Sequence, residues 1–295
     1  MKVYAIVVTY NGSKWINKCF ASLLNSTIPL KVLVIDNLST DGTTDLIQNK
    51  FPQVEVIKAG QNLGFGKANN IGLKMALENN ADYVFLLNQD AWVEPDTIEK
   101  LINIQFQHPQ FHLLSPIHLN GSGDAIDRHF QVYLGPEHTA GFYSDLYLGK
   151  LKPFYQGKYA NAAAWLLTHH CLEIVGGFDT LFNHYGEDDD FIQRFHRCNL
   201  KLAIVSNAVI YHDRLQTNSR SKIFNDNLAY TQALKLLKGS KTPKYHFLFR
   251  LIIADIFTFI FVYFGKNEML KTKIKSLYFA IKLKHKVSHH LNHNI

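Results

Sequence analysis

Four adjacent acids, Glu187-Asp188-Asp189-Asp190, are the residues whose types and spacing point most clearly to chemistry. They follow the segment 176–179 (Gly-Gly-Phe-Asp) and precede the helix-like segment 191–195. The first turn of a helix tolerates negative charge because the positive end of the helix dipole lies there. That explains part of the cluster, but carboxylates also serve as a general base or as ligands of a cation. We therefore treat these acids as a candidate catalytic element.

Two further polar positions follow apolar runs. Asn88-Gln89-Asp90 comes directly after the run 83–87, and His212 ends the run 208–211. Asn88 and Asp90 point the same way in extended backbone, because side chains alternate along a strand. Asp90 and His212 together suit Mg²⁺ or Mn²⁺ that is held mostly by substrate phosphates. A single histidine at a strand end is also common as a structural residue, and both interpretations stay open.

The elements that must position these groups alternate between strand and helix over the first 107 residues. Short apolar runs bounded by turn residues alternate with longer helical patterns. This order predicts an α/β fold with a Rossmann-like, mostly parallel central sheet flanked by helices, and with ligands beyond the carboxyl ends of the strands. The predicted strands are Val3–Thr9, Val32–Ile35, Val54–Lys58 and Tyr83–Leu87, and the predicted helices are Ser13–Leu24, Thr40–Lys50, Gly66–Glu78 and Pro95–Gln107.

The turns between these elements carry polar residues. Asp36 ends the second strand too early to cap the next helix, and it is placed to accept hydrogen bonds from a base or a ribose. Ser39 or Thr40 is the expected cap. The loop 62–69 contains two asparagines and two glycines, and the glycines permit a close approach of the backbone to a ligand.

The periodicity weakens between Ile117 and Tyr159, where we expect short strands or a mobile loop. Order returns with a strand at 162–167 and a short helix at 171–175. Strand patterns follow at 202–205 and 209–212, and we place the end of this part of the chain at residue 217.

Composition narrows the class of protein. A chain of 295 residues can bury a sizeable core. Its three cysteines are odd in number and widely spaced, which argues against a disulfide framework and a zinc cluster and favours a reducing cytosol. The apolar run 3–8 is too short for a signal peptide, so we interpret it as a buried strand.

The net charge of +7 is unevenly distributed. From Arg220 onward, 14 lysines and arginines face three acids, so this region carries +11 and the rest of the chain carries −4. The region also contains an apolar stretch at 247–264 interrupted by Arg250 and Asp255. This pattern favours an anionic membrane surface over nucleic acid, with amphipathic helices of region 218–295 lying in the interface. Packing of these helices on the protein's own core is the alternative.

The ordered motifs resemble the family 2 inverting glycosyltransferases of the GT-A fold, especially the rhamnosyltransferase-like branch that builds bacterial surface polysaccharides. The resemblance spans residues 3–212, and Asn88 stands where the family's Asp-x-Asp metal motif has its first acid. The matching segments are Val7-Val8-Thr9-Tyr10-Asn11, Asp36-Asn37-x-Ser39-x-Asp41-Gly42, Asn62-x-Gly64-Phe65-Gly66 with Asn69 and Gly72, Leu86-Leu87-Asn88-Gln89-Asp90, Gly176-Gly177-Phe178-Asp179, and Glu187-Asp188-x-Asp190-Phe191 with Arg194.

The resemblance implies a role for each motif. Residues 1–217 would form the GT-A catalytic domain, with nucleotide-sugar binding in 1–115 and the acceptor and catalytic part in 116–217. Asp188 would be the catalytic base, and Asp90 with His212 would hold Mg²⁺ or Mn²⁺. Trp165 and Glu187 would contact the donor or acceptor sugar, and a position in the buried core is the alternative for Trp165. The implied nucleotide-binding residues are Thr9, Tyr10, Asn11, Asp36, Asn62, Gly66, Asn69 and Asn88.

The implied activity is transfer of a sugar from a UDP-, dTDP- or GDP-sugar to a hydroxyl of a lipid-linked or growing bacterial surface glycan. The enzyme would be cytoplasmic and peripheral on the inner face of the membrane. A non-catalytic, membrane-associated protein of glycan assembly with the same fold is the alternative. A dinucleotide-dependent oxidoreductase is disfavoured, because the first βα turn, residues 9–13, lacks Gly-x-Gly-x-x-Gly.

Overall fold

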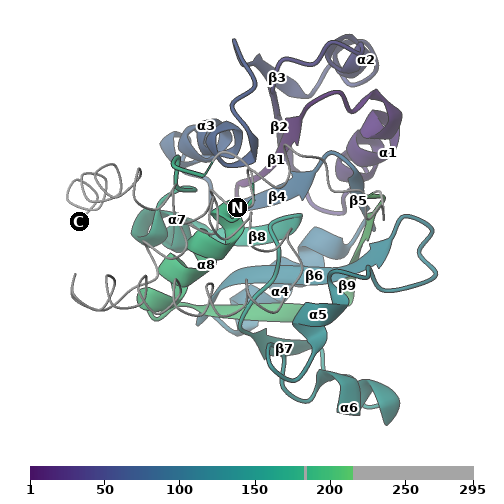
Figure 1. Cartoon of the computed structure of the whole chain (residues 1–295), viewed down its shortest axis with the longest axis vertical. Helices are drawn as coiled ribbons and strands as arrows, with labels where there is room; N and C mark the ends of the chain where they lie inside the picture. Colours follow the sequence, from purple (N-terminus) through teal and green to yellow (C-terminus); the bar gives the residue numbers. More distant parts are fainter. Residues whose placement is uncertain (183–184, 215–295) are drawn as a thin grey trace, which may run out of the picture. The chain divides into compact units, whose positions relative to one another are not determined.

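A computed structural model describes residues 1–182 and 185–214. Over the first 107 residues the predicted alternation of strands and helices is confirmed, and helix α1 has the predicted bounds (Figure 1). The strands are β1 (Val3–Thr9), β2 (Lys31–Asp36), β3 (Glu55–Lys58), β4 (Tyr83–Asn88), β5 (Ala91–Val93), β6 (Phe111–Asn120), β7 (Phe154–Gly157), β8 (Ala164–Thr168) and β9 (Lys201–His212). The helices are α1 (Ser13–Leu24), α2 (Thr43–Lys50), α3 (Phe65–Glu78), α4 (Thr97–Gln107), α5 (Gln131–Leu134), α6 (Phe142–Tyr147), α7 (His169–Val175) and α8 (Glu187–Arg197).

The described strands form one mixed sheet rather than a mostly parallel one. Its order is β3-β2-β1-β4-β8-β6-β9-β5, and β7 pairs with β9 beside this path. The pairs β1–β2, β1–β4, β2–β3 and β6–β9 are parallel, whereas β4–β8, β6–β8, β5–β9 and β7–β9 are antiparallel. The prediction failed for the second half, where β8 lies between β4 and β6 and is antiparallel to both.

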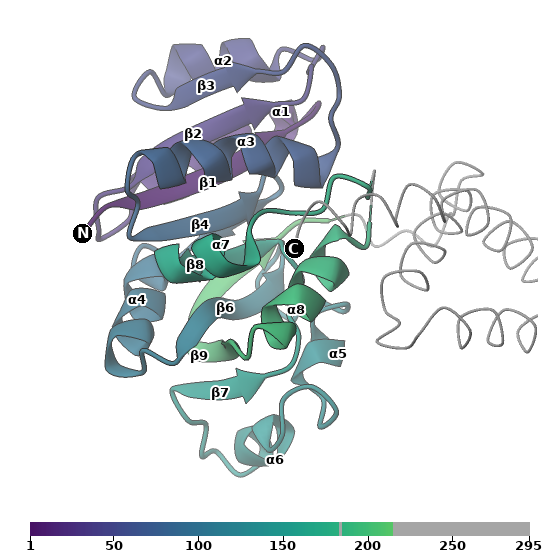
Figure 2. The same ribbon diagram turned by 90° about the vertical axis from the view of Figure 1, so that its left-hand side faces the viewer.

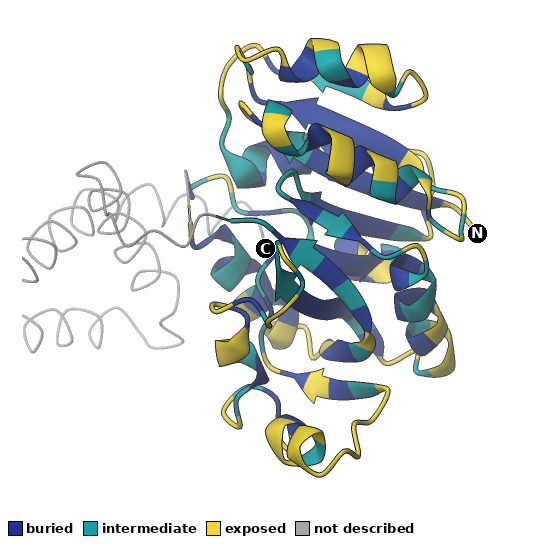
Figure 3. Cartoon of the chain, turned by 90° about the vertical axis from the view of Figure 1, so that its right-hand side faces the viewer, coloured by how far each residue is buried: buried dark blue, intermediate teal, exposed yellow. Residues whose placement is uncertain are grey.

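Side chains of β1 alternate between two cores, one on each face of the sheet. Ala5 and Val7 pack in the core that contains residues of α1, α2 and α4. Tyr4 and Ile6 pack in the other core, with residues of α3, α7 and α8. Figure 2 shows α3, α7 and α8 along one face of the sheet, and Figure 3 shows the strands as its most buried part. This coverage leaves the ends of the strands for a binding site.

Strand register brings the predicted site residues of the first strands together. Thr9 is paired with Asp36 across β1 and β2, and Asn88 of β4 lies opposite Val8 of β1. On the other side of the sheet, His212 at the end of β9 is paired with Ala91 of β5. Gln89 and Asp90 therefore form the short turn between β4 and β5, and this turn brings Asp90 close to His212.

Helix α2 begins three residues later than predicted, and neither Ser39 nor Thr40 caps it. Its cap residue is Gly42, which has a left-handed backbone (φ 81°). The side chain of Asp41 accepts hydrogen bonds from the Thr43 N–H (3.1 Å) and from the Ser13 N–H (3.0 Å), at the first turns of α2 and α1. The expected cap was wrong because the loop before α2 uses its hydroxyls for other partners.

Two strands that the sequence did not reveal complete the site. β6 starts at Phe111, before the segment that we expected to be irregular, and β5 has only three residues. The two predicted strand patterns at 202–205 and 209–212 form the single strand β9. A register shift against β6 between Pro116 and Ile117 accommodates the polar interruption at 206–207.

One compact unit comprises Met1–Asp179 and Asp188–Gln216, and the segment Thr180–Glu187 belongs to a second unit. The predicted boundary at 217 and the predicted amphipathic helices of 218–295 lie outside the described residues. Among the helices of the described ranges, each is too short or too polar to span a bilayer.

Candidate active site

The first two strands end in a buried hydrogen-bonded pair. The Thr9 hydroxyl donates to Asp36 Oδ1 (2.8 Å), and both side chains are buried. The Ser39 hydroxyl donates to the same oxygen (2.6 Å), and the Ser39 N–H donates to Oδ2 (2.9 Å). These contacts fix the Asp36 carboxylate at the carboxyl edge of the sheet. Oδ2 accepts one of these bonds, so it has a lone pair left for a ligand hydroxyl.

Asn11 holds the loop that follows Asp36. Its own backbone is left-handed (φ 47°), and its N–H donates to the Ser39 hydroxyl (2.9 Å). Its side-chain oxygen accepts a hydrogen bond from the Thr40 N–H (2.8 Å). Asn11 therefore shapes the predicted nucleotide loop through its backbone and its side chain together.

Gln89 joins the first and fourth βα turns. Its amide accepts from the Tyr10 N–H (2.9 Å) and donates to the Tyr10 carbonyl (3.1 Å). A Cβ on Gly12 would overlap Gln89 Oε1, so a larger residue there would require the Gln89 side chain to move. The Tyr10 ring remains 47% exposed. The two hydrogen bonds between Gln89 and the Tyr10 backbone thus fix an exposed aromatic ring beside the strand ends.

The third βα turn is tied to the second through Asn37. The Asn37 side chain accepts from the Leu63 N–H (3.2 Å) and donates to the Gly64 carbonyl (3.1 Å). Asn62 accepts from the Gly64 N–H (2.9 Å) and is itself exposed.

Two predicted nucleotide-binding residues lie inside helix α3. Gly66 and Asn69 are both buried, and the Asn69 amide donates to the Phe65 carbonyl (3.0 Å). The structure therefore assigns Asn69 a contact within its own helix, and its nucleotide role stays a prediction.

Asp90 and His212 lie close together, as the metal prediction requires. His212 Nε2 is 3.3 Å from Asp90 Oδ1, the histidine is 3% exposed, and the carboxylate is 21% exposed. The Asp213 N–H donates to the Asp90 carbonyl (2.8 Å), which fixes the end of β9 against the turn. Two buried atoms, Asn88 Oδ1 and His212 Nδ1, have no hydrogen-bond partner among the described residues.

This pair fits a divalent cation that is shared with a substrate. One carboxylate oxygen and one imidazole nitrogen converge at the sheet edge. No group of three or more histidine, cysteine, aspartate or glutamate side chains in the described ranges is arranged to hold a metal. Mg²⁺ and Mn²⁺ are commonly held by one or two protein ligands plus substrate phosphates, so the pair is sufficient only when a phosphorylated ligand is bound.

The acidic helix is anchored by Arg194. Its guanidinium donates to Asp190 Oδ2 (2.8 Å) within α8 and to the Gly177 carbonyl (2.7 Å) in the preceding loop. Asn70 of α3 holds the same loop, because its side chain exchanges two hydrogen bonds with the Phe178 backbone (2.7 and 2.8 Å). These contacts explain how the Gly-Gly-Phe-Asp segment positions Asp188 at the start of α8.

Asp188 lies beside two tyrosines from the segment that sequence reasoning could not interpret. Tyr159 hydrogen-bonds to the Asp188 side chain and to Tyr133, and the two tyrosine rings are 4.7 Å apart. Burial, and then the charges of Asp188 and Asp189, raise the pKa of Tyr133 to about 12 and raise the pKa of Tyr159 further. Both phenols therefore stay protonated at neutral pH, and Tyr159 acts as a donor to the carboxylate.

The two predicted sugar contacts have different outcomes. Trp165 is fully buried, with its ring against Phe178 (6.1 Å between centroids) and Phe191 (5.3 Å), so it presents no face for stacking on a sugar. We assign it to the core. Glu187 belongs to the second compact unit, and its role stays a prediction.

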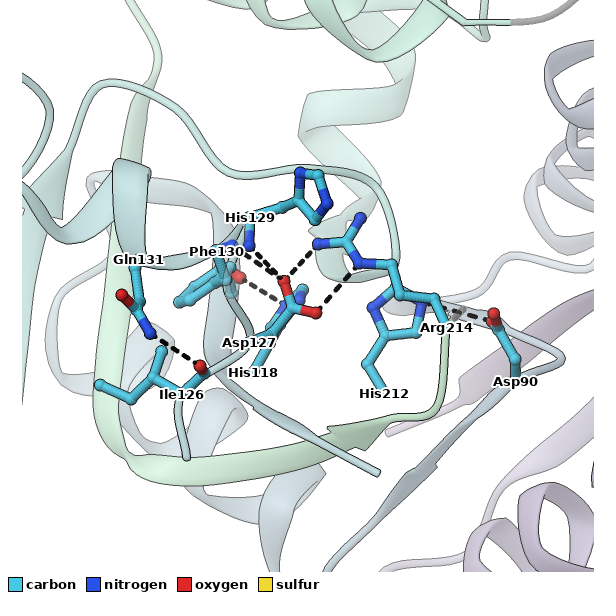
Figure 4. Close-up of polar contacts among 10 residues, drawn as sticks. Asp90, His118, Ile126, Asp127, His129, Phe130, Gln131, His212 and Arg214 are labelled. Atoms are coloured by element: carbon cyan, nitrogen blue, oxygen red, sulfur yellow. Dashed lines mark hydrogen bonds and ion pairs between the residues drawn. The ribbon is translucent and has the colours of Figure 1, made fainter. Parts of the chain in front are cut away.

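Two charged residues near the site were missed. Asp127 lies in the loop after β6 and is fully buried, and Arg214 follows His212 by two residues (Figure 4). Arg214 lies just beyond the predicted strand 209–212, so the side-chain alternation of a strand did not place it. Asp127 had no sequence signal either, because the periodicity around it is weak.

Comparisons with known proteins identify the family of the chain. A family model described as Glycosyl transferase family 2 matches residues 4–160. An N-acetylglucosaminyl-diphospho-decaprenol L-rhamnosyltransferase of Mycobacterium tuberculosis is 25% identical over 236 residues, which cover 73% of this chain and 77% of that protein. The dTDP-rhamnosyl transferase RfbF of Shigella flexneri is 32% identical over 100 residues, covering 34% of this chain and 33% of that one.

Solved structures share the fold. The structure of TarS residues 1–349 from S. aureus in complex with UDP-GlcNAc has a TM-score of 0.58 at 19% identity, covering 93% of this chain and 76% of that one. A mannosyltransferase from Pyrobaculum calidifontis in complex with GDP-Man and Mn²⁺ also has a TM-score of 0.58, at 17% identity, covering 96% and 87%.

Proposed function

The chain belongs to glycosyl transferase family 2 and is a glycosyltransferase, and we propose an inverting transfer from a nucleotide sugar to a glycan hydroxyl. The observation that carries the proposal is the Asp90–His212 pair, 3.3 Å apart at the sheet edge where Thr9 and Asp36 also end their strands. The second relevant feature is Asp188 with its hydrogen bond from Tyr159. These features supply a nucleotide loop, a place for a cation, and a base.

The donor is proposed to be a UDP-, dTDP- or GDP-sugar. The nucleoside would lie over the first two βα turns, where Asp36 Oδ2 accepts from a hydroxyl and the exposed Tyr10 ring packs on the base. Support comes from relatives whose names and structures include dTDP-rhamnosyl transfer, UDP-GlcNAc and GDP-Man. Their variety is the reason for keeping three nucleotides in the test.

Asp90 and His212 would hold Mg²⁺ or Mn²⁺ against the donor's diphosphate. A cation there would neutralise the negative charge that builds on the leaving group. The solved mannosyltransferase with Mn²⁺ supports this assignment. Asn88 adds a neutral amide, so Asp90 is the only carboxylate of residues 88–90 available to the cation.

Asp188 is proposed as the general base. It removes the proton from the acceptor hydroxyl while that oxygen attacks the anomeric carbon, and the bond from that carbon to the diphosphate oxygen breaks. The electron pair of the broken bond leaves with the nucleoside diphosphate. Attack from the face opposite the leaving group inverts the configuration in a single displacement. The hydrogen bond from Tyr159 orients the carboxylate before the acceptor binds.

The acceptor is proposed to be a lipid-linked or growing surface glycan at the inner face of a bacterial membrane. The mycobacterial relative is named for a decaprenol-linked acceptor. Described residues also support contact with lipid. Tyr143, Leu146 and Tyr147 share one face of α6 and are 41%, 43% and 90% exposed. Leu148, 60% exposed, and Lys150 follow them, an arrangement typical of interfacial segments.

Vesicle sedimentation tests the lipid contact. The double variant Leu146→Ser/Tyr147→Ser should bind phosphatidylglycerol-containing vesicles more weakly than the native chain does. Phe106→Ser is the matched control, because Phe106 is 82% exposed on α4, away from α6. Equal binding by the double variant and the native chain would exclude α6 as a lipid contact.

A donor panel tests the reaction itself. Release of nucleoside diphosphate is measured with UDP-, dTDP- and GDP-sugars, in Mg²⁺, Mn²⁺ or EDTA, with membrane extract as acceptor. We expect turnover of one donor with the native chain, and loss of at least about 100-fold in Asp188→Asn, the low end of what a general base contributes. Asp188→Asn activity equal to the native activity would support the alternative, a glycan-binding protein that keeps the fold without using this base.

A further inference from the structure

Asp213 and Arg214 directly follow β9, and their side chains have different partners. Asp213 accepts from Trp15 Nε1 (2.8 Å) and lies 3.2 Å from the Lys14 ammonium, so it faces helix α1. The Arg214 side chain instead reaches Asp127, and Figure 4 shows it on the side where His212 lies. His212 in turn contacts Asp90. The Arg214 guanidinium therefore lies beside the proposed cation site (Figure 4).

Asp127 accepts two hydrogen bonds from this guanidinium. Arg214 Nε donates to Asp127 Oδ2 (3.0 Å), and Arg214 Nη2 donates to Oδ1. The same carboxylate accepts from the N–H groups of His129 and Phe130 (both 2.9 Å), and the Asp127 N–H donates to the His118 carbonyl (2.8 Å). The carboxylate is fully buried and immobilised, so it gives the guanidinium one fixed orientation.

Part of the guanidinium remains available. Arginine has five N–H donors, and among the described residues Asp127 accepts from two of the nitrogens that carry them. The Arg214 side chain is 25% exposed, whereas the Asp127 side chain is 0% exposed. Burying the Asp127 carboxylate costs desolvation free energy, so the ion pair is weak evidence for a role in stability alone. The exposed edge of the guanidinium can bind an anion, because its planar fork of N–H donors matches phosphate oxygens.

We propose that Arg214 binds the diphosphate of the donor and of the released nucleoside diphosphate, with Asp127 as its positioning residue. The inference rests on the proposed function, because that function supplies the diphosphate. The Arg214–Asp127 pair is neutral as a whole, so its contribution is a set of aligned donors rather than net charge. These donors supplement a cation site in which Asn88 has replaced one carboxylate by a neutral amide.

Tyr133 connects this site to the catalytic base. The positive charge of Arg214 and the negative charges of Asp188 and Asp189 all act on the Tyr133 hydroxyl. Arg214 and the proposed base Asp188 are therefore both close enough to Tyr133 for their charges to affect its hydroxyl.

A purely structural role predicts a different result from diphosphate binding. If Arg214 only neutralises Asp127, its replacement lowers stability and affects all nucleotides equally. If Arg214 binds the diphosphate, its replacement weakens the binding of nucleoside diphosphates and leaves the binding of nucleoside monophosphates nearly unchanged. The ratio of the two dissociation constants separates the roles without any measurement of sugar transfer.

The experiment measures dissociation constants for UDP and UMP, and for the dTDP, dTMP, GDP and GMP pairs, with Mn²⁺ and with EDTA. Arg214→Gln should weaken the preferred diphosphate about 10-fold or more, as loss of a charge-assisted hydrogen bond predicts, and the monophosphate by less than about 3-fold. Asp127→Asn should shift the same ratio in the same direction but by less. Lys100→Gln is the matched control, since Lys100 pairs with Asp96 on the surface of α4.

A second variant protects the test against misfolding. Arg214→Gln leaves the buried Asp127 without its partner, whereas Asp127→Asn/Arg214→Gln replaces the ion pair by two neutral amides of similar shape. We expect this double variant to bind the diphosphate no more weakly than Arg214→Gln alone, because the two residues act as one unit. Native-like diphosphate affinity in both Arg214 variants would overturn the inference and leave the proposed function standing. Failure of the native chain to bind any of the nucleotides would overturn the proposed function, and the inference with it.

Discussion

Tyr159 donates a hydrogen bond to the carboxylate of Asp188, and its own pKa is raised so far by burial and by the charges of Asp188 and Asp189 that it remains a donor at every physiological pH. A hydrogen bond to the charged form of a carboxyl group lowers the pKa of that group. Tyr159 therefore helps to keep the proposed base deprotonated and ready to accept a proton.

Tyr159→Phe should shift the pH dependence of the reaction. Removal of the donor raises the pKa of Asp188, so the base becomes protonated at a higher pH. The acid limb of the kcat profile should then move upward by about 0.5 to 1 pH unit, the range expected for loss of about one hydrogen bond to a charged group. Initial rates measured across the acid limb at saturating donor provide the profile.

Tyr155→Phe is the matched control. The Tyr155 hydroxyl donates to Asp145 (2.9 Å), a carboxylate outside the proposed site. Its profile should coincide with that of the native chain. If Tyr159→Phe also has the native acid limb, Tyr159 does not influence the base.

Asp90→Asn should reduce the affinity of the proposed cation. Asp90 Oδ1 is the oxygen nearest His212 Nε2, and an amide oxygen is a weaker ligand than a carboxylate. The Mn²⁺ concentration that gives half-maximal activity should rise at least about 10- to 100-fold, which is the usual effect of losing even an outer partner of a metal ligand. A titration of activity with Mn²⁺ measures it.

Asp96→Asn is the control for that titration, because Asp96 is a surface residue that pairs with Lys100 (2.8 Å). It should leave the Mn²⁺ requirement unchanged. Identical Mn²⁺ curves for Asp90→Asn and the native chain would show that Asp90 does not hold the cation.

The sequence was sufficient for the half of the fold in which local and tertiary preferences agree. β1 is buried on both faces and reads as a continuous apolar run, and α1 has a regular apolar stripe, so both were predicted with their observed bounds. The polar residues at or just after the ends of β1, β2 and β4, namely Thr9, Asp36 and Asp90, were then expected at one edge of the sheet.

The missing parts depend on contacts between residues far apart in the chain. β5 has three residues and exists because it pairs with β9, more than 100 residues later. Asp127 lies in a loop without periodicity and is recognisable only through its contact with Arg214. For Trp165 the sequence left a sugar contact and a core position open, and only the packing of its ring against Phe178 and Phe191 decides between them.

Gly12→Ala should disturb the first nucleotide loop. A Cβ at this position would overlap Gln89 Oε1, so the Gln89 amide would have to leave the Tyr10 backbone. We expect weaker binding of nucleoside diphosphate, by about 3- to 10-fold, because two hydrogen bonds of modest net value are lost. Calorimetric titration measures the change.

Two variants interpret that result. Gly60→Ala is the matched control, since a Cβ there has no atom within 4 Å. Gln89→Ala removes the clashing group, so Gly12→Ala/Gln89→Ala should bind no more weakly than Gln89→Ala alone. Additive losses in the double variant would mean that the overlap with Gln89 is not the cause.

Asp41 should make the stability of the chain depend on pH. Burial raises the pKa of this carboxyl, but hydrogen bonds from Thr43 and Ser13 outweigh that effect and lower the pKa to about 2. Because the folded pKa is below the unfolded value of about 3.9, the stabilisation is fully present above pH 4 or so and is lost as the pH falls toward about 2. Asp41→Asn should therefore be less stable than the native chain at neutral pH, and the difference in unfolding free energy should shrink below about pH 4. Urea unfolding at several pH values measures the difference, with Glu78→Gln at the exposed end of α3 as control. A constant difference between Asp41→Asn and the native chain over this range would show that the Asp41 carboxylate does not join the first turns of α1 and α2 through its charge.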